Sequence, residues 1–289
     1  MKRFSLFIVG VALLASACQG KGAVSIGPAP SGNPGPSLSP SPRPSPSPTG
    51  TSSPMPTPSQ SRKVTFQVWF IRHGMLFETK RTELFSAGVA QLALDAMFQG
   101  PSDVESGAEV WTATPAGANG DISELSKGMA TVQISDAFYD GASSTVRLRQ
   151  AQVLYTLTQY STIRRVRFGM TDGSVRPKVW TRADFEDLLP AIVVENPLIG
   201  SKVSSPVTVS GTANVFEATV SLRILDENGK EIARTFTTAT CGTGCRGDYS
   251  VSVRFSVDHR QHGTIEVFES SAKDGSPINL VTIPVTLLP

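Results

Sequence analysis

Few residues of the chain combine the type and the spacing that catalysis requires. The chain has three histidines: His73, His259 and His262. None lies in a motif that would position a nucleophile or a zinc ion, and no G-x-S-x-G, H-E-x-x-H or P-loop pattern is present. His259 and His262 lie three residues apart in a predicted loop between strands, where a solvated polar turn is more common than a pair of metal ligands. The sequence therefore predicts no metal site and no cofactor.

Two acidic side chains that face each other could cleave a glycosidic bond. Such a pair must face one groove, with its carboxyl groups roughly 5 to 9.5 Å apart. Glu269 and Asp274 lie near one end of the predicted C-terminal domain, and Glu217 lies near another edge. Their spacing brings no two of them together, and surface solvation or turn formation explains them equally well. We predict no catalytic residue, and an enzyme that acts on cell-wall glycan or peptide is the alternative interpretation.

The tryptophans could contribute to binding, because an exposed indole ring can stack on a sugar ring. The chain has three of them: Trp69, Trp111 and Trp180. Trp69 lies in an alternating segment, on the face opposite Phe66 and Phe70. Core filling is the alternative for each tryptophan, and Trp111 and Trp180 are undecided. Trp69 is the candidate ligand-stacking residue.

A cysteine near the start of the chain has a different chemistry. Lys2 and Arg3 precede an apolar run at residues 4–15, and Cys18 follows a triplet of small residues. This order is typical of a cleavable export signal, and the apolar run is shorter than the ~20 residues of a membrane-spanning helix. The triplet and cysteine resemble the lipobox of bacterial lipoproteins, with Ala15 in place of the usual leucine. The resemblance implies that residues 1–17 are removed and that Cys18 is acylated, whereas an ordinary secretory signal is the alternative.

The two remaining cysteines lie close together in the C-terminal part of the chain. Cys241 and Cys245 flank a Gly-Thr-Gly segment. In an oxidising compartment such a pair predicts a disulfide. The alternative is half of a metal site, which His259 and His262 alone would have to complete. Because the bridge would close a very short loop, we expect it to fix a local turn more than to stabilise a whole domain.

Composition changes sharply after the predicted lipid anchor. Residues 19–62 consist mostly of Ser, Pro, Gly and Thr, and 12 of the chain's 21 prolines lie within them. Such a segment buries little apolar surface, so we expect residues 18–62 to be a disordered stalk with polyproline II character. At about 3.1 Å per residue it could span on the order of 130 Å. The segment is interpreted as a spacer, and a passive linker is the alternative.

The next part of the chain, residues 63–190, mixes helical and strand periodicity. The expected elements are a strand at 64–70, a helix capped by Ser86 and ended by Gly100-Pro101, a hairpin at 122–134, a helix at 144–160, a strand at 166–170 and a short helix from Thr181 with Asp184 as its capping partner. Strands combined with two substantial helices predict an α+β domain in which helices cover a sheet.

Residues 191–289 have no helical periodicity. They contain short alternating apolar segments, separated by turn signals at Asn196-Pro197, Asn228-Gly229 and Asp274-Gly275. Strands at such regular spacing are typical of an all-β sandwich. The sequence therefore predicts an immunoglobulin-like sandwich that follows the α+β domain.

Several short blocks, in a fixed order, carry a resemblance in the first of these domains. They are Arg81 ahead of a helix that ends in Phe98-Gln99-Gly100-Pro101, then Thr114-Pro115-Ala116-Gly117, residues 128–135, residues 152–160 and Val166-Arg167-Phe168. With these blocks, residues 63 to about 175 resemble the GerMN domain of bacterial sporulation and spore-germination proteins.

A second set of blocks lies in the predicted sandwich. They are residues 196–200, residues 205–213, Val215-Phe216-Glu217-Ala218 and residues 268–276. With them, residues 192–287 resemble the immunoglobulin-like domain of bacterial spore germination. The loop from Cys241 to Cys245 has no counterpart in the pattern of that family.

Together, these features predict a lipoprotein anchored at the extracytoplasmic face of the cell membrane. The formal charge is +2, from 26 Lys and Arg against 24 Asp and Glu, and removal of Lys2 and Arg3 would leave a neutral chain. A neutral chain has no electrostatic footprint for nucleic acid. The two resemblances imply a protein of the cell envelope without assigned catalysis. We expect a binding or scaffolding module whose partner is an envelope protein or a cell-wall polymer.

Overall fold

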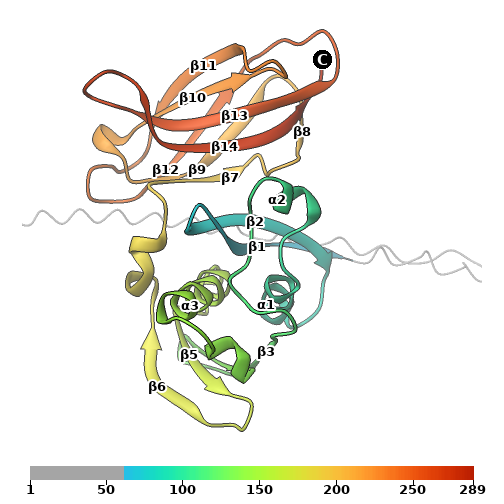
Figure 1. The fold of residues 1–289 in the computed structure, drawn as a ribbon, viewed down its shortest axis with the longest axis vertical. Helices are drawn as coiled ribbons and strands as arrows, with labels where there is room; N and C mark the ends of the chain where they lie inside the picture. Colours follow the sequence, from blue (N-terminus) through green and yellow to red (C-terminus); the bar gives the residue numbers. More distant parts are fainter. Residues whose placement is uncertain (1–61) are drawn as a thin grey trace, which may run out of the picture. The chain divides into compact units, whose positions relative to one another are not determined.

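The computed structural model describes residues 62–289, which belong to a compact unit formed by Thr57–Pro289 (Figure 1). The predicted signal peptide, the predicted acylation site Cys18 and residues 19–61 of the predicted stalk lie outside the described residues. Within residues 62–289, no helix is long and apolar enough to cross a membrane.

The described chain begins with a hairpin that the sequence predicted only in part. Strand β1 (Lys63–Arg72) pairs antiparallel with β2 (Met75–Leu84), from Lys63 opposite Leu84 to Arg72 opposite Met75. His73 and Gly74 connect the strands, with φ values of 51° and 78°. Two consecutive positive φ angles are typical of the tight turn whose twist matches that of the flanking strands.

A four-stranded sheet follows in the order β3-β4-β5-β6. Its strands are β3 (Gly120–Ser126), β4 (Met129–Ile134), β5 (Arg165–Met170) and β6 (Val175–Trp180). Strands β4 and β5 are parallel and the other pairs are antiparallel. The hairpin β3–β4 and strand β5 confirm the prediction, whereas β6 was missed because its residues alternate weakly and remain largely exposed.

Helices α1 (Val89–Gln99) and α3 (Ser143–Leu157) confirm the two predicted long helices. The predicted cap at Ser86 is wrong, because the N-cap of α1 is Gly88 and no side chain caps it. The last predicted helix is a 3-10 helix, η2 (Arg182–Leu188), with the expected capping box between Thr181 and Asp184. The short α2 (Asp103–Gly107) and the 3-10 helix η1 (Asp136–Tyr139) were not predicted.

Polar side chains of α3, and of Gln159 in the turn that follows it, take the place of a neighbouring strand along the free edge of β1. The Gln159 side chain accepts from the backbone N of Gln67 at 2.7 Å and donates to its carbonyl at 2.8 Å. Thr156 Oγ1 accepts from the backbone N of Trp69 at 3.1 Å, and Gln152 Nε2 donates to the Trp69 carbonyl at 3.1 Å. Positions i, i+4 and i+7 share one face of a helix. The polar residues of this helical block therefore have a structural role.

The C-terminal part is a sandwich of two sheets, as the sequence predicted. One sheet has the order β11-β10-β13-β14-β8 and the other β12-β9-β7. The strands are β7 (Ile192–Asn196), β8 (Lys202–Val203), β9 (Val207–Ala213), β10 (Thr219–Leu225), β11 (Glu231–Thr238), β12 (Gly247–Val253), β13 (Gln261–Ser270) and β14 (Pro277–Leu287). In β9 and β10 alternate side chains are buried, which is the pattern of strands with one face on a core.

The described residues form two apolar cores that are in contact. The first core lies among the β1–β2 hairpin, the four-stranded sheet and the helices, and the second lies between the two sheets of the sandwich. Phe77 and Ile199 pack against both cores, and Val193 of β7 belongs to the first. The α+β domain and the sandwich are therefore packed together within one compact unit.

Candidate functional site

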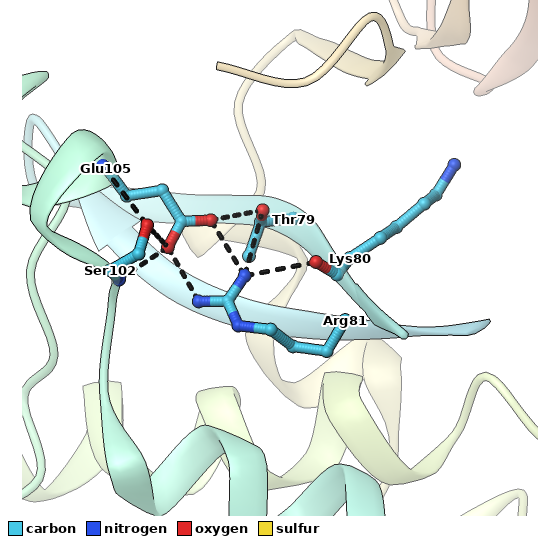
Figure 2. A network of polar contacts seen from close by, with 5 residues as sticks. All are labelled: Thr79, Lys80, Arg81, Ser102 and Glu105. Atoms are coloured by element: carbon cyan, nitrogen blue, oxygen red, sulfur yellow. Dashed lines mark hydrogen bonds and ion pairs between the residues drawn. The ribbon is translucent and has the colours of Figure 1, made fainter. Parts of the chain in front are cut away.

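A buried polar network joins β2 to α2 (Figure 2). Arg81 donates to both carboxylate oxygens of Glu105, from Nη1 to Oε1 at 2.9 Å and from Nη2 to Oε2 at 2.6 Å. Thr79 Oγ1 also donates to Oε1, and the backbone N and Oγ of Ser102 donate to Oε2 at 2.7 and 2.9 Å. Glu105 is only 4% exposed. A buried carboxylate that accepts this many hydrogen bonds holds the short helix in one position.

These donors also determine the ionisation of Glu105. Burial by itself raises the pKa of Glu105, but the hydrogen bonds from Arg81, Thr79 and Ser102 outweigh it and lower the pKa from 4.5 to about 2. The carboxylate is therefore ionised at every physiological pH. With all its oxygen lone pairs engaged, it is unsuited to act as a general acid or base, and its role is structural.

The network places α2 against the sandwich domain. A Cβ atom on Gly200 would lie only 2.7 Å from Cγ1 of Val104 in α2, and Gly200 has a φ of 78°. Both the close approach and the positive φ favour glycine at this position. Arg81 and Glu105 thus connect the β1–β2 hairpin, through α2, to the loop that precedes β8.

Hydrogen bonds from the hairpin to the sandwich lie alongside this contact. Arg72 donates from Nη1 to the carbonyl of Thr282 at 2.6 Å and from Nη2 to its Oγ1 at 3.0 Å. Lys80 donates from Nζ to the carbonyl of Glu195 at 2.9 Å. Arg72 is only 8% exposed. We call these residues, with Phe77, the domain seam.

A cavity of about 210 Å³ lies at the domain seam. Its lining residues come from the β1–β2 hairpin, from the start of β7 and from β14, and most of them are apolar. Glu78 is among them and is 2% exposed, and its Oε1 has no hydrogen-bond partner within the described residues. Burial and the nearby charge of Glu195 raise the pKa of Glu78 to about 8, against the opposing effects of Lys80 and Arg182. Glu78 is therefore mostly protonated at neutral pH.

These seam residues could not be recognised from the sequence. Glu78 and Lys80 belong to a strand that was not predicted, and their long-range partners, Glu195 and Arg182, lie more than 100 positions away in the chain. Two features of the sequence could have indicated this strand: the His73-Gly74 turn, and the spacing of two that places Leu76 and Glu78 on the same face. Arg81 belongs to the blocks that carry the resemblance to the GerMN domain, and that resemblance gives it no role.

Trp69 does not have the exposure that was expected for a ligand-stacking residue. It is 3% exposed, and its ring lies 5.0 Å from that of Tyr155 at an interplanar angle of 57°. The expectation was wrong because both faces of β1 are covered in this region, one of them by α3. A stacking role for Trp69 would require an open ring face, which this burial does not leave.

The other two tryptophans differ from Trp69 and from each other. Trp111 is 44% exposed and forms an isolated bridge with Ile71 beside the hairpin. Trp180, at the end of β6, is half-buried and stacks on Phe185 at 5.0 Å between ring centroids. Lys178 Nζ lies 3.5 Å from the Trp180 ring centroid.

The predicted pair Cys241 and Cys245 is joined by a disulfide, with the two Cα atoms 5.7 Å apart. The bridged loop packs against the 3-10 helix η3 (Phe216–Ala218). Thr243 N donates to the carbonyl of Val215 at 2.9 Å, and Glu217 N donates to Thr243 Oγ1 at 3.0 Å. The bridge thus fixes a local turn against a neighbouring loop.

The remaining candidates do not form a reactive group. His259 Nδ1 lies 2.6 Å from Asp258 and its Nε2 lies 3.4 Å from Glu227, while His262 lies in β13 and not in the expected loop. Within residues 62–289, no group of three or more His, Cys, Asp or Glu side chains is arranged to hold a metal ion.

The carboxylates considered for glycoside cleavage have separate structural partners. Glu269 accepts from the backbone N of Phe216 at 3.1 Å and from Asn279 Nδ2 at 2.7 Å. Asp274 accepts from the backbone N and Oγ of Ser276. The two acids are thus engaged in turn and loop contacts.

Comparison with known families decides what the two domains are. Residues 49–175 match the family described as "Sporulation and spore germination". Residues 191–276 match the "Immunoglobulin-like domain of bacterial spore germination". The chain carries both domains. Both resemblances inferred from the sequence are thereby confirmed, and neither family description names a reaction. Comparison with curated proteins gave no match.

Three solved structures are similar to parts of the chain. The first GerMN domain of the sporulation protein GerM from Bacillus subtilis is 20% identical, with 40% of this chain and 87% of that chain covered and a TM-score of 0.34. The tandem GerMN domains of the same protein are 13% identical over 68% and 63% of the two chains, with a TM-score of 0.35. A putative lipoprotein from Clostridium perfringens is 15% identical over 44% and 93%, with a TM-score of 0.29.

Proposed function

We propose that this chain is a non-catalytic binding or scaffolding module of the cell envelope. In this proposal a lipid on Cys18 anchors it at the extracytoplasmic face of the membrane, and residues 19–62 act as a spacer. The germination-related GerMN domain and the immunoglobulin-like domain then engage an envelope protein or a wall polymer as one body.

The domain seam is the observation that supports this proposal. The Arg72 guanidinium is bound to Thr282 of the sandwich, and Phe77 packs against both apolar cores. A module of this kind presents its two surfaces in a fixed relation, so a partner that contacts both of them does not have to order them first. The buried carboxylate of Glu105 accepts hydrogen bonds from Arg81 and Ser102, which agrees with a structural role for this acid.

Anchoring is tested by replacing Cys18. A Cys18→Ala variant should move from the membrane fraction to the soluble extracytoplasmic fraction. A variant with both Cys241 and Cys245 replaced by serine is the matched control, because it also loses thiol chemistry but should stay with the membrane. Retention of the Cys18→Ala variant in the membrane fraction would contradict lipid anchoring.

Binding is tested with the purified full-length chain in detergent. We expect retention on isolated cell wall without release of soluble fragments, or specific crosslinking to an envelope protein in intact cells. Catalytic release of wall fragments would favour the alternative, an enzyme that acts on wall glycan or peptide. Release that disappears when one carboxylate is replaced would refute the non-catalytic function.

A further inference from the structure

A surface hollow of about 460 Å³ lies within the GerMN domain, at η1, α3 and β6. Its lining residues include two arginines, Arg147 and Arg176, and no acid. Tyr139, Gln150 and Trp180 also line it. A concave surface with aromatic rings and several polar groups has the general composition of a ligand-binding site.

Arg176 provides an available positive charge at this hollow. Its guanidinium carbon lies 3.8 Å from the centroid of the Tyr139 ring, so the two groups are stacked. Within residues 62–289, no carboxylate lies within ion-pair distance of Arg176. The ring is itself held by a 3.1 Å hydrogen bond from Tyr139 Oη to the carbonyl of Gly169. One N–H group, at Nη2, points to Met170 Sδ at 3.8 Å. Stacking orients the guanidinium plane, and the other N–H groups at its edge can donate to an anion.

Arg147, on the α3 wall of the hollow, is held by its neighbours. It donates to both carboxylate oxygens of Asp187, at 2.9 and 2.6 Å, and to the carbonyl of Asp184 at 2.8 Å. Its guanidinium carbon lies 5.2 Å from the ring centroid of Phe185, on which Trp180 stacks. This wall is therefore held in place before any ligand binds, which lowers the entropy cost of binding.

Gln150 provides a neutral polar group. It is only 9% exposed as a whole residue, but its side-chain amide is accessible to solvent at the hollow. A primary amide can both donate and accept hydrogen bonds, so it can bind a hydroxyl or amide group of a ligand in place of water.

We propose that this hollow binds an acidic sugar unit of a cell-wall polymer, with its carboxylate or phosphate on Arg176 and a hydroxyl or amide on Gln150. This inference rests on the proposed function and names the ligand class and the site. A neutral glycan would leave the Arg176 charge unused. The acidic group is held by charge-assisted hydrogen bonds, and the aromatic rings below the guanidinium and beside Arg147 exclude water from one side of the site.

The test uses sedimentation of the full-length chain in detergent with purified wall sacculi. Three preparations are compared: intact sacculi, sacculi treated with hydrofluoric acid to remove phosphodiester-linked polymers, and sacculi whose carboxyl groups have been amidated. Arg176→Gln removes the charge and Arg176→Lys keeps it without the planar fork. Arg254→Gln is the matched control, because Arg254 is an exposed arginine of the sandwich domain.

On intact sacculi we expect Arg176→Gln to weaken binding by about tenfold or more, Arg176→Lys to be intermediate and Arg254→Gln to stay within about twofold of wild type. One of the two chemical treatments should reduce wild-type binding to the level of Arg176→Gln, and it identifies the acid as phosphate or carboxylate. Unfolding midpoints of all variants should match, because both arginines are exposed.

Four results would overturn the inference. Equal weakening by Arg176→Gln and Arg254→Gln would indicate non-specific charge attraction. Wild-type binding that survives both treatments would exclude an acidic sugar. Wild-type binding that does not depend on Arg176 would place the wall-binding surface elsewhere while leaving the proposed function intact. Absence of any wild-type sedimentation would overturn the inference and the wall-polymer form of the function together.

Discussion

The buried carboxyl of Glu78 should make the folded chain less stable as the pH rises. The pKa of Glu78 is raised from 4.5 to about 8, first by burial and then by the nearby charge of Glu195. Between these two pH values the folded chain binds a proton that the unfolded chain has lost. The free energy of unfolding therefore falls as the pH rises through this window, and the loss ends above the pKa of the folded state.

The size of this effect follows from the two pKa values. A difference between 4.5 and about 8 corresponds to about 5 kcal/mol over the whole window. Between pH 5 and pH 7 the linkage relation gives a loss of about 2 to 3 kcal/mol. Glu78→Gln keeps the shape of the protonated side chain and cannot ionise. We therefore expect this variant to be more stable than wild type by about 1 kcal/mol at pH 5 and by about 3 kcal/mol at pH 7.

Urea unfolding followed by tryptophan fluorescence measures this difference, because Trp69 lies directly opposite Glu78 in the hairpin. Glu83→Gln is the matched control, since Glu83 is an exposed carboxyl of the same strand, and its pH profile should stay parallel to that of wild type. If the profiles of Glu78→Gln and wild type are parallel between pH 5 and pH 7, the carboxyl is ionised in the folded state and the reasoning is refuted.

Three further variants test the other polar contacts. Glu105→Gln should lower the free energy of unfolding by about 3 kcal/mol at pH 7, because it breaks a buried ion pair. Since the pKa of Glu105 is about 2 in the folded chain, this loss of stability relative to wild type should shrink as the pH falls from 4.5 towards 2. A loss that stays constant over this range would contradict the pairing. Arg72→Ala should cost about 2 to 3 kcal/mol and raise hydrogen exchange in β14, and unchanged exchange there would show that its contacts with Thr282 do not hold the seam. Replacing Cys241 and Cys245 by serine should cost about 2 kcal/mol or less, with faster proteolysis confined to the bridged loop and its neighbour; loss of the whole sandwich would show that the bridge has a global role.

The prediction from the sequence was best where the spacing of the apolar residues matches the pattern of buried side chains. Strands β9 and β10 follow a period of two over their whole length, and alternate side chains are buried. Helix α3 was also predicted, although its residues 149–157 are all buried. Strand β2 was missed because it has apolar residues at its start and charged or polar residues from Glu78 onward. Glu78 and Thr79 are buried, partly by contacts with distant parts of the chain, whereas Thr82 and Glu83 are exposed. Local periodicity carries no information about such contacts.

The site residues show the same limit. The cysteine pair could be predicted, because the spacing alone brings the thiols together. The burial of Trp69 could not, since alternation shows which face a residue occupies but not whether a second layer covers that face. The layer in this case is α3, whose polar residues Gln152 and Thr156 bond the backbone of β1. Polar side chains on a helix ordinarily indicate a face that is exposed to solvent. On α3 they instead bond the backbone at the edge of a strand.

The β1–β2 hairpin is the element on which both domains depend. A two-stranded hairpin is at best marginally stable alone in water. Here one of its edges is bonded by side chains of α3 and by Gln159 just after it, while Phe77 and Lys80 of its other strand contact the sandwich. Separating the domains would expose Phe77 and leave Arg72 without its acceptors on Thr282. Because the same short hairpin completes the first core and joins it to the second, a change in its packing reaches both domains, and a ligand that binds either domain acts on a single body.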